Sequence, residues 1–260
     1  NKENVIYSFR TSISYWLDNG PFHRLFAFHL LRSLAVRVRD FRRTFLPKIG
    51  VLEQHPPVPI LVPDHYTKLP LLDPAKTPRI SIVTPSYNQA AFIEQTVKSV
   101  LDQGYPNLEY VVQDGGSTDG TVELMRPYVQ RITHFESRKD RGQAHAINLG
   151  IKHTSGEIMA YLNSDDILLP GSLNYVADYF TRHPDVDVIY SHRVILNEKG
   201  EEIGRWIMPR HDNEVILWAD YVPQETLFWR RSLWEKAGNQ MDESYQFALD
   251  CDMLVRFRAA

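Results

Sequence analysis

An apolar run that ends in adjacent carboxylates is the part of this sequence best suited to chemistry. Residues 158–162 are apolar and are followed at once by Asn163, Ser164, Asp165 and Asp166. Neighbouring carboxylates repel each other and resist leaving water. A divalent cation relieves both penalties, because hard cations favour oxygen ligands and are often completed by substrate phosphates. The segment therefore indicates a cation site for a phosphorylated substrate, although Asn-Ser-Asp-Asp also suits a solvated turn or a helix cap.

The overall composition fits a globular protein with one large core. The 260 residues are 43% apolar and carry a net charge of −3, so the charge gives no indication of a nucleic acid partner. The single cysteine, Cys251, cannot form an internal disulfide, which fits a reducing, cytoplasmic compartment. No apolar run approaches the ~20 residues that span a bilayer. The chain does not begin with Met, and we expect both ends to lie inside a longer protein.

Residues 1–46 predict a helical segment with a basic face. The apolar side chains that recur at steps of four or three are Phe22, Phe26, Leu30, Leu34, Val38, Phe41 and Phe45. Arg32, Arg39 and Arg43 fall on the opposite side. Two interpretations stay open: a helix packed on the main domain with a solvated basic face, or peripheral contact with a partner helix or with anionic lipid at the inner face of the cell membrane.

Residues 47–78 are predicted to be an extended linker. They contain eight prolines, which lack a backbone donor and resist helix interiors. Such a segment can lie along the surface of the domain that follows.

From residue 79 onward, the pattern alternates between strands and helices. Strands are expected at residues 79–84, 108–112, 132–135, 158–162 and 186–190. Helices are expected at residues 90–102, 119–129, 143–153 and 172–183, the last capped by Ser172. This alternation predicts an α/β domain with a mainly parallel sheet over residues 79–260.

Polar, glycine-rich or acidic loops follow four consecutive predicted strands. They are residues 84–89, 113–120, 136–143 and 163–166. In open α/β sheets, ligands bind beyond the carboxyl ends of the strands. We therefore expect these four loops to meet around one pocket.

Several side chains in these loops suit a nucleotide. Asp114 directly ends an apolar strand, and its carboxylate could accept the imide N–H of a uracil ring. Gly115 and Gly116 would let the backbone approach a ligand closely, and Tyr87 could stack on a base. Arg141 could neutralise phosphate beside the start of the next helix. Residues 117–119 also suit a helix cap, an alternative that leaves Asp114 unexplained.

Taken together, these motifs resemble those of family 2 glycosyltransferases with the GT-A fold. The matching segments are residues 82–88, 114–121, 140–143, 146–150 and 162–166. Their order and spacing carry the resemblance, which leaves residues 1–78 outside it. It implies a Rossmann-like domain that transfers a sugar from a nucleotide diphosphate sugar, commonly a UDP-sugar, with inversion. The acceptor would be a hydroxyl of a growing or lipid-linked glycan, with residues 79–192 binding the nucleotide and residues 193–260 facing the acceptor.

The resemblance also implies individual site residues. Positions that match those lining the nucleotide are Thr84, Pro85, Tyr87, Asn88, Asp114, Gly116 and Ser117. Asp140 and Arg141 match a loop that approaches the base. Asn163, Ser164 and Asp165 match the family's Asp-x-Asp metal motif with Asn in first place. Asp165 would then hold Mn²⁺ or Mg²⁺ with Asp166 in support, while Asn163 could bond the ribose or a water.

Inverting transfer also needs a base for the acceptor hydroxyl. Asp250 is the candidate, since residues 247–254 resemble the family's late acidic motif. The alternative is that Asp250 only caps the last helix. Gln224 and Glu225 lie in a segment that resembles an acceptor-side segment of the family.

Two other function classes compete with this interpretation. A nucleotidyltransferase would carry a glycine-rich, basic loop after the first strand, and residues 84–89 have neither property. A binding module without turnover is the second, and Asn163 is the residue that favours it.

Overall fold

The chain divides into two units, residues 1–48 and residues 49–260. The computed structural model describes residues 49–67 and 73–260, so the predicted basic helical segment lies outside the described residues. In the part that is described, no helix is long and apolar enough to cross a membrane.

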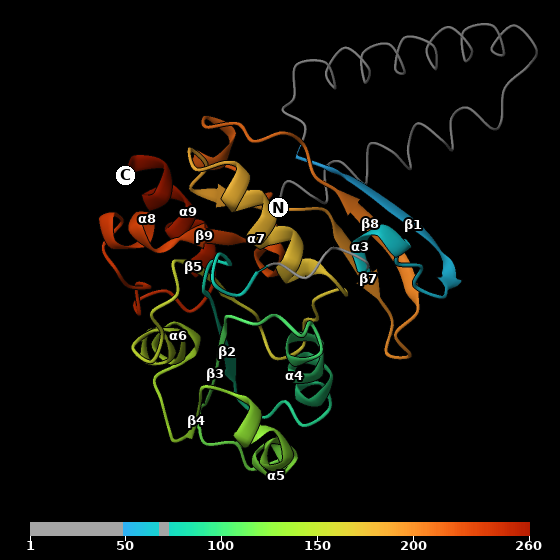
Figure 1. Ribbon diagram of the computed structural model, residues 1–260, viewed down its shortest axis with the longest axis vertical. Helices are drawn as coiled ribbons and strands as arrows, with labels where there is room; N and C mark the ends of the chain where they lie inside the picture. The colour runs from blue at the N-terminus through green and yellow to red at the C-terminus, as the bar shows by residue number, and fades with distance from the viewer. Residues whose placement is uncertain (1–48, 68–72) are drawn as a thin grey trace, which may run out of the picture. The chain divides into compact units, whose positions relative to one another are not determined.

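A six-stranded sheet organises the second unit (Figure 1). Its strands lie in the order β4-β3-β2-β5-β9-β6. The bounds are β2 Ile80–Ser86, β3 Leu108–Asp114, β4 His134–Ser137, β5 Ile158–Tyr161, β6 Val188–Ile189 and β9 Phe228–Arg230. The first four neighbours pair in parallel, whereas β9 pairs antiparallel with both β5 and β6. The predicted α/β fold with a mainly parallel sheet is therefore confirmed.

Helices cover both faces of this sheet, and each face has its own apolar core. In Figure 1, α6 (Gln143–Ile151) lies on one side of β2 and β3, and α4 (Ile93–Leu101) lies on the other. The first core joins α6, α8 (Arg231–Lys236) and α9 (Leu249–Ala259) to the sheet. It includes Val83, Val111, Ile147, Trp229, Trp234 and Met253. The second joins α4 and α7 (Ser172–Arg182) to the sheet, and it includes Ile80, Ile82, Val97, Val112, Val176 and Phe180. Side chains alternate between faces along each strand, so β2 and β3 contribute to both cores.

The helices follow the predicted order with two corrections. Their bounds are α4 Ile93–Leu101, α5 Thr121–Met125, α6 Gln143–Ile151, α7 Ser172–Arg182, α8 Arg231–Lys236 and α9 Leu249–Ala259. The helix predicted over residues 119–129 ends at Met125 and continues as the 3₁₀ helix Arg126–Arg131, since Pro127 has no N–H to extend the α pattern. Ser172 does not cap α7: Gly171 stands at the cap, and the Ser172 hydroxyl donates back to the Leu169 carbonyl.

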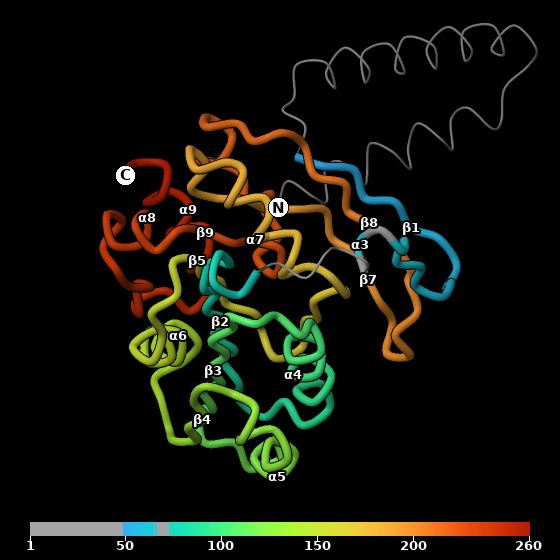
Figure 2. Tube along the Cα trace, in the orientation of Figure 1, coloured from blue at the N-terminus to red at the C-terminus, as the bar shows by residue number. Residues whose placement is uncertain are grey.

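A smaller antiparallel sheet in the order β1-β8-β7 lies apart from the main one. It consists of β1 Val51–Val58, β8 Glu202–Ile207 and β7 Arg193–Leu196, and the short helix α3 Asp64–Thr67 follows β1. Part of the segment predicted as a linker is thus a strand. In Figure 2 the chain runs out through β7 and β8 beside β1 and then returns to α8 and α9 near β5. This excursion separates β6 from β9 in the sequence, although the two strands are neighbours in the main sheet.

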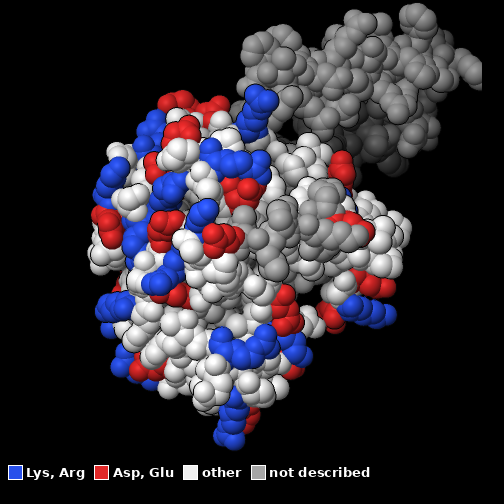
Figure 3. Space-filling view, in the orientation of Figure 1, with Lys and Arg blue, Asp and Glu red and all other residues white. Residues whose placement is uncertain are grey.

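Charges of both signs are interspersed over the face of the molecule seen in Figure 3. A nucleic-acid-binding face would instead gather Lys and Arg into one broad patch. The face drawn there shows no such patch.

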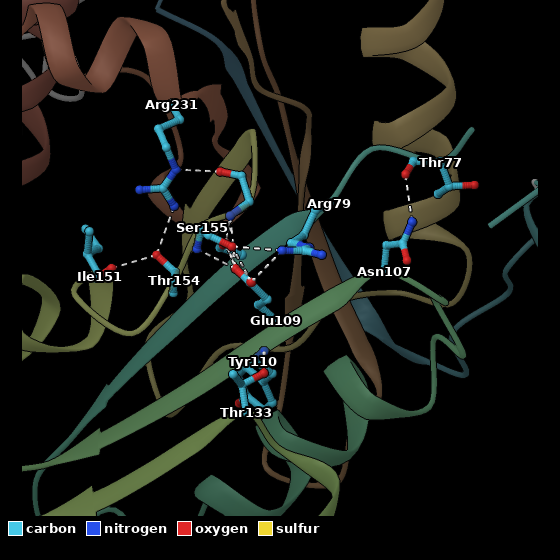
Figure 4. A network of polar contacts seen from close by, with 12 residues as sticks. Thr77, Arg79, Asn107, Glu109, Tyr110, Thr133, Ile151, Thr154, Ser155 and Arg231 are labelled. Carbon is cyan, nitrogen blue, oxygen red and sulfur yellow. Dashed lines mark hydrogen bonds and ion pairs between the residues drawn. The ribbon is translucent and has the colours of Figure 1, made fainter. Parts of the chain in front are cut away.

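The Glu109 carboxylate ties the amino-terminal end of the sheet together. It accepts hydrogen bonds from the Ser81 hydroxyl at 2.7 Å, the Ser155 N–H at 2.6 Å and the Gly156 N–H at 2.9 Å. Figure 4 shows Ser155 and Arg79 converging on it. Arg231 donates to the Gly156 carbonyl and so closes the same turn from α8. This network holds β2, β3 and the start of β5 in register at the end opposite the predicted pocket.

We expect Glu109→Gln to lower the free energy of unfolding by on the order of 2 kcal/mol, because a neutral amide accepts these bonds less strongly. Burial raises the pKa of Glu109, but hydrogen bonds from Ser155, Ser81 and Gly156 outweigh it and leave the pKa below its ordinary 4.5. Because the folded-state pKa is depressed, this stabilisation is present above that value and is lost as the pH falls through the folded pKa. Urea unfolding at pH 7 and at acid pH measures both effects.

The control is Glu123→Gln, which removes an exposed carboxylate on α5 and should change stability little. Equal stability of the Glu109 and Glu123 variants at pH 7 would contradict the role of this network.

Candidate active site

A cavity of about 780 Å³ opens at the carboxyl end of the four parallel strands. It is lined by Pro85, Ser86, Tyr87 and Gln89 after β2, Gly115 and Gly116 after β3, Lys139, Asp140, Gly142, Gln143 and Ala146 after β4, and Asn163, Ser164 and Asp165 after β5. The four loops predicted to converge therefore do so. We call this space the first cavity.

Some of the predicted nucleotide residues are not among those that line it. Thr84 is fully buried, and its hydroxyl bonds the Tyr110 hydroxyl at 3.0 Å, which joins β2 to β3 within the sheet. Asn88 is exposed and has a left-handed backbone (φ 53°). Its side chain accepts the Thr118 N–H while its own N–H donates to the Ser117 hydroxyl, which ties the loop after β2 to the loop after β3.

Asp114 requires the main correction. It was expected to lie open at the pocket floor, but its side chain is 0% exposed. Its two oxygens accept four hydrogen bonds, from the N–H groups of Gly116 and Ser117 and from the hydroxyls of Ser117 and Ser137. Its burial among these donors leaves no exposed carboxylate oxygen on the cavity. Asp114 instead joins the loop after β3 to the end of β4.

Asp140 occupies the position that Asp114 was expected to fill. One of its oxygens accepts the Gly142 N–H at 2.8 Å. The other lies over Gly115, where a Cβ would come within 3.0 Å of it and within 3.3 Å of the Tyr87 ring. The absence of a side chain at residue 115 therefore leaves a slot between an exposed aromatic ring and a carboxylate.

Arg141 also departs from its expected role. Its guanidinium forms an ion pair with Glu243, which lies 102 residues later and also accepts a bond from Asn148. Arg141 does not line the first cavity, but Lys139, two residues earlier in the same loop, does line it. Lys139 thus supplies the positive charge there.

A second, smaller cavity of about 250 Å³ adjoins the first. It is lined by Gln143, Tyr161, Asn163, Asp166, Arg193, Gln224, Glu225, Gln246, Phe247, Ala248, Leu249 and Asp250. Asp250 sits in the first turn of α9 and faces this space, while Asp252 is paired with Arg256 along the helix. The structure therefore brings Asp250 together with Gln224 and Glu225.

The two adjacent carboxylates that follow β5 line different cavities. Asp165 is exposed and lines the first, and Asp166 is partly buried and lines the second. Burial raises the pKa of Asp166 to about 7, and the carboxylates of Glu225 and Asp165 add to the effect against the opposing Arg193. Arg193 forms a two-pronged ion pair with Glu225 and lies over the Trp206 ring.

Asn163 belongs to both cavities and links them. Gln224 donates through its amide nitrogen to the Tyr161 carbonyl at 2.6 Å, so its amide oxygen must accept. That oxygen accepts from the Asn163 amide nitrogen at 3.0 Å, and the Asn163 oxygen in turn accepts from Gln143. An aspartate has no donor for Gln224. The chain of bonds therefore gives a physical reason for Asn at this position.

Sequence reasoning missed several residues that line the cavities. Lys139 and Gln143 carried a usable signal, since they lie close to Asp140 in a loop already expected at the pocket. Phe247 carried one too, because it begins the segment 247–254 that contains Asp250. Arg193 did not, because the irregular pattern after residue 193 gave no basis for bringing it to this edge.

Solved structures with the same fold include TarS of S. aureus and a mannosyltransferase. A chain of TarS residues 1–349, in complex with UDP, has a TM-score of 0.53 and 20% identity, and the match covers 68% of this chain and 54% of that one. The mannosyltransferase PcManGT from Pyrobaculum calidifontis, in complex with GDP-Man and Mn²⁺, has a TM-score of 0.54 and 25% identity, over 75% of this chain and 56% of that one. Both comparisons support a GT-A type fold.

Sequence comparison points the same way. An uncharacterized glycosyltransferase of Rickettsia typhi is 28% identical over 190 residues, which are 70% of this chain and 59% of the relative. The chain thus spans less than two thirds of the relative's length. The family model described as glycosyl transferase family 2 matches residues 81–260. This chain therefore belongs to glycosyl transferase family 2.

Proposed function

We propose that this protein transfers a sugar from a UDP-sugar to a hydroxyl of a growing glycan, with inversion at the sugar carbon. The observation that carries the proposal is the pair of adjoining cavities, which share Gln143 and Asn163. One has the nucleotide-type slot and Asp165, and the other has Asp250. A sugar held where they meet would have its diphosphate on one side and the acceptor on the other.

The uracil ring is assigned to the slot over Gly115. Tyr87 is 63% exposed and can stack on the base, and the free oxygen of Asp140 can accept its imide N–H. Lys139, on the same cavity, can offset the diphosphate charge. TarS binds UDP, which agrees with this choice, whereas PcManGT binds GDP-Man. Guanine also has an imide N–H, so calorimetry with UDP and GDP decides between the two bases.

The residues present fit a divalent cation held mainly by the substrate. No cluster of three or more His, Cys, Asp or Glu suited to a metal occurs in residues 49–67 and 73–260. Asp165 nonetheless offers an exposed carboxylate on the cavity that would hold the diphosphate. Mg²⁺ is commonly bound through one or two carboxylates plus substrate phosphates. Once bound, Mn²⁺ or Mg²⁺ would stabilise negative charge on the departing diphosphate.

Asp250 is the proposed general base. Its carboxylate takes the proton of the acceptor hydroxyl as that oxygen forms a bond to the anomeric carbon. The carbon–oxygen bond to the phosphate breaks on the opposite face, and its electron pair leaves with UDP. Attack from the face opposite the leaving group is what inverts the anomeric configuration.

The two alternative functions, a nucleotidyltransferase and a binding module without turnover, fit these cavities less well. A nucleotidyltransferase would need a glycine-rich, basic loop after β2, where this chain has Thr-Pro-Ser-Tyr-Asn-Gln. A binding module without turnover drew its support from Asn163, whose bonds to Gln143 and Gln224 offer a structural reason for that residue.

Replacing Asp250 by Asn should lower transfer by a factor on the order of 10²–10⁴, the usual contribution of a general base. Binding of UDP should persist, because Asp250 lines only the second cavity. Turnover of UDP-sugars followed by UDP release, together with UDP calorimetry, measures both. Asp252→Asn, in the same helical turn, is the matched control and should turn over near the wild-type rate. Wild-type turnover in Asp250→Asn would remove Asp250 from this role.

Cation dependence should reside in Asp165. In the wild-type protein, Mn²⁺ is expected to strengthen UDP binding severalfold, and Asp165→Asn should abolish that gain. Calorimetric titration of UDP with and without Mn²⁺ reads this without any need for activity. Asp185→Asn removes an exposed carboxylate that lines neither cavity and should keep the gain. A gain of equal size in Asp165→Asn would contradict the assignment.

The proposal includes peripheral attachment through the basic N-terminal segment. Arg32, Arg39 and Arg43 would attract anionic headgroups. The full chain should therefore sediment with vesicles that contain phosphatidylglycerol, and replacing these three arginines by Glu should release it. Equal sedimentation of the two proteins would contradict this attachment.

A further inference from the structure

The mouth of the second cavity carries an aromatic side chain that the protein core does not use. Phe247 is 85% exposed and lines this cavity with Asp250, Gln246 and Glu225. Two residues later, Leu249 is buried in the core at the start of α9. Between them, Ala248 has a left-handed backbone (φ 58°), which is uncommon for alanine. This turn buries Leu249 while Phe247 stays in solvent beside the proposed base.

The loop that carries Phe247 is fastened to the domain beside the first cavity. Asn148 on α6 accepts the Met241 N–H and donates to the Met241 carbonyl. Glu243 accepts from Asn148 and pairs with Arg141. The loop is thus anchored at its start, and α9 fixes its end. Phe247 therefore belongs to a segment that is held at both ends, and it lines the second cavity.

The chemistry around Phe247 matches a sugar ring. Amide side chains line the cavity at Gln143, Asn163, Gln224 and Gln246 and can bond hydroxyl groups. A flat apolar ring beside such groups suits the C–H face of a pyranose.

The charge of the cavity selects among sugars. Asp166, Glu225 and Asp250 face one guanidinium, that of Arg193, which is the one Lys or Arg among the described residues lining it. That guanidinium is already paired with Glu225. A negatively charged sugar in this cavity would be repelled by the carboxylates, whereas a neutral sugar would not.

We propose that the second cavity is the acceptor subsite and that it takes a neutral pyranose stacked on Phe247, in preference to a uronic acid or a phosphorylated sugar. This inference rests on the proposed function, because it takes Asp250 to be the base for the acceptor hydroxyl. The stacked ring would present a hydroxyl to Asp250 at the boundary with the first cavity.

Saturation-transfer NMR on the full chain, with UDP and Mg²⁺ present, tests this directly. The probes are the methyl pyranosides of glucose, galactose, mannose and N-acetylglucosamine, with the methyl glycosides of glucuronic and galacturonic acid as charged counterparts. We expect at least one neutral glycoside to bind through its ring protons and to outcompete its uronide. Its affinity should fall about tenfold in Phe247→Ala and persist in Phe247→Trp.

Tyr245→Ala is the matched control, since Tyr245 is exposed in the same loop but lines neither cavity. It should bind the glycoside as the wild type does. The inference is overturned if no neutral glycoside binds, if a uronide binds more tightly, or if Phe247→Ala keeps wild-type affinity. Calorimetry with UDP distinguishes failure of this inference from failure of the proposed function. If the wild-type protein binds UDP but no glycoside, only this inference is rejected. If it does not bind UDP, the proposed function is rejected.

Discussion

The buried Asp114 carboxylate is the interaction on which the site depends. It stands at the end of β3 and accepts bonds from its own loop and from Ser137 at the end of β4. The Ser117 hydroxyl that donates to it also accepts the Asn88 N–H, which brings in the loop after β2. One carboxylate thus holds three loops in place, and a buried charge with four donors is strongly favoured over one left unpaired. Without this anchor, neither the slot over Gly115 nor the position of Asp140 would be defined.

The acidic cluster after β5 is best understood as three residues with separate tasks. Asp165 faces the first cavity and Asp166 the second, while Asn163 joins them through Gln143 and Gln224. An aspartate at residue 163 would add charge beside Asp165 but would break the link to Gln224. This segment therefore has one exposed carboxylate, which suits the proposed cation, and a neutral amide between the two cavities. This division is what allows diphosphate and acceptor to lie close together in the proposed reaction.

The succession of strands and helices from residue 79 to residue 190, and the edge at which their loops meet, were predictable from the sequence, because hydrophobic periodicity and the parallel-sheet rule are local or general. Within those loops, the resemblance to family 2 glycosyltransferases indicated residues 85, 87, 116, 140 and 163–165, which line the first cavity. Which carboxylate would be open was not predictable, since Asp114 is closed by Ser137, a contact across 23 residues. Likewise, Arg141 is neutralised by Glu243, and β1 pairs with β8, through contacts that leave no periodic signal. Long-range pairing thus decided which predicted residues line the cavities.

The most direct test compares Asp114→Asn with Asp140→Asn by thermal unfolding and UDP calorimetry on the same preparations. If Asp114 is the anchor and Asp140 the contact with the base, Asp114→Asn lowers both the melting temperature and UDP affinity. Asp140→Asn then lowers UDP affinity by about tenfold, as expected when a neutral amide replaces a charged acceptor, and leaves the melting temperature unchanged. The opposite pattern, in which Asp114→Asn loses UDP binding at a wild-type melting temperature and Asp140→Asn binds UDP normally, would contradict the account.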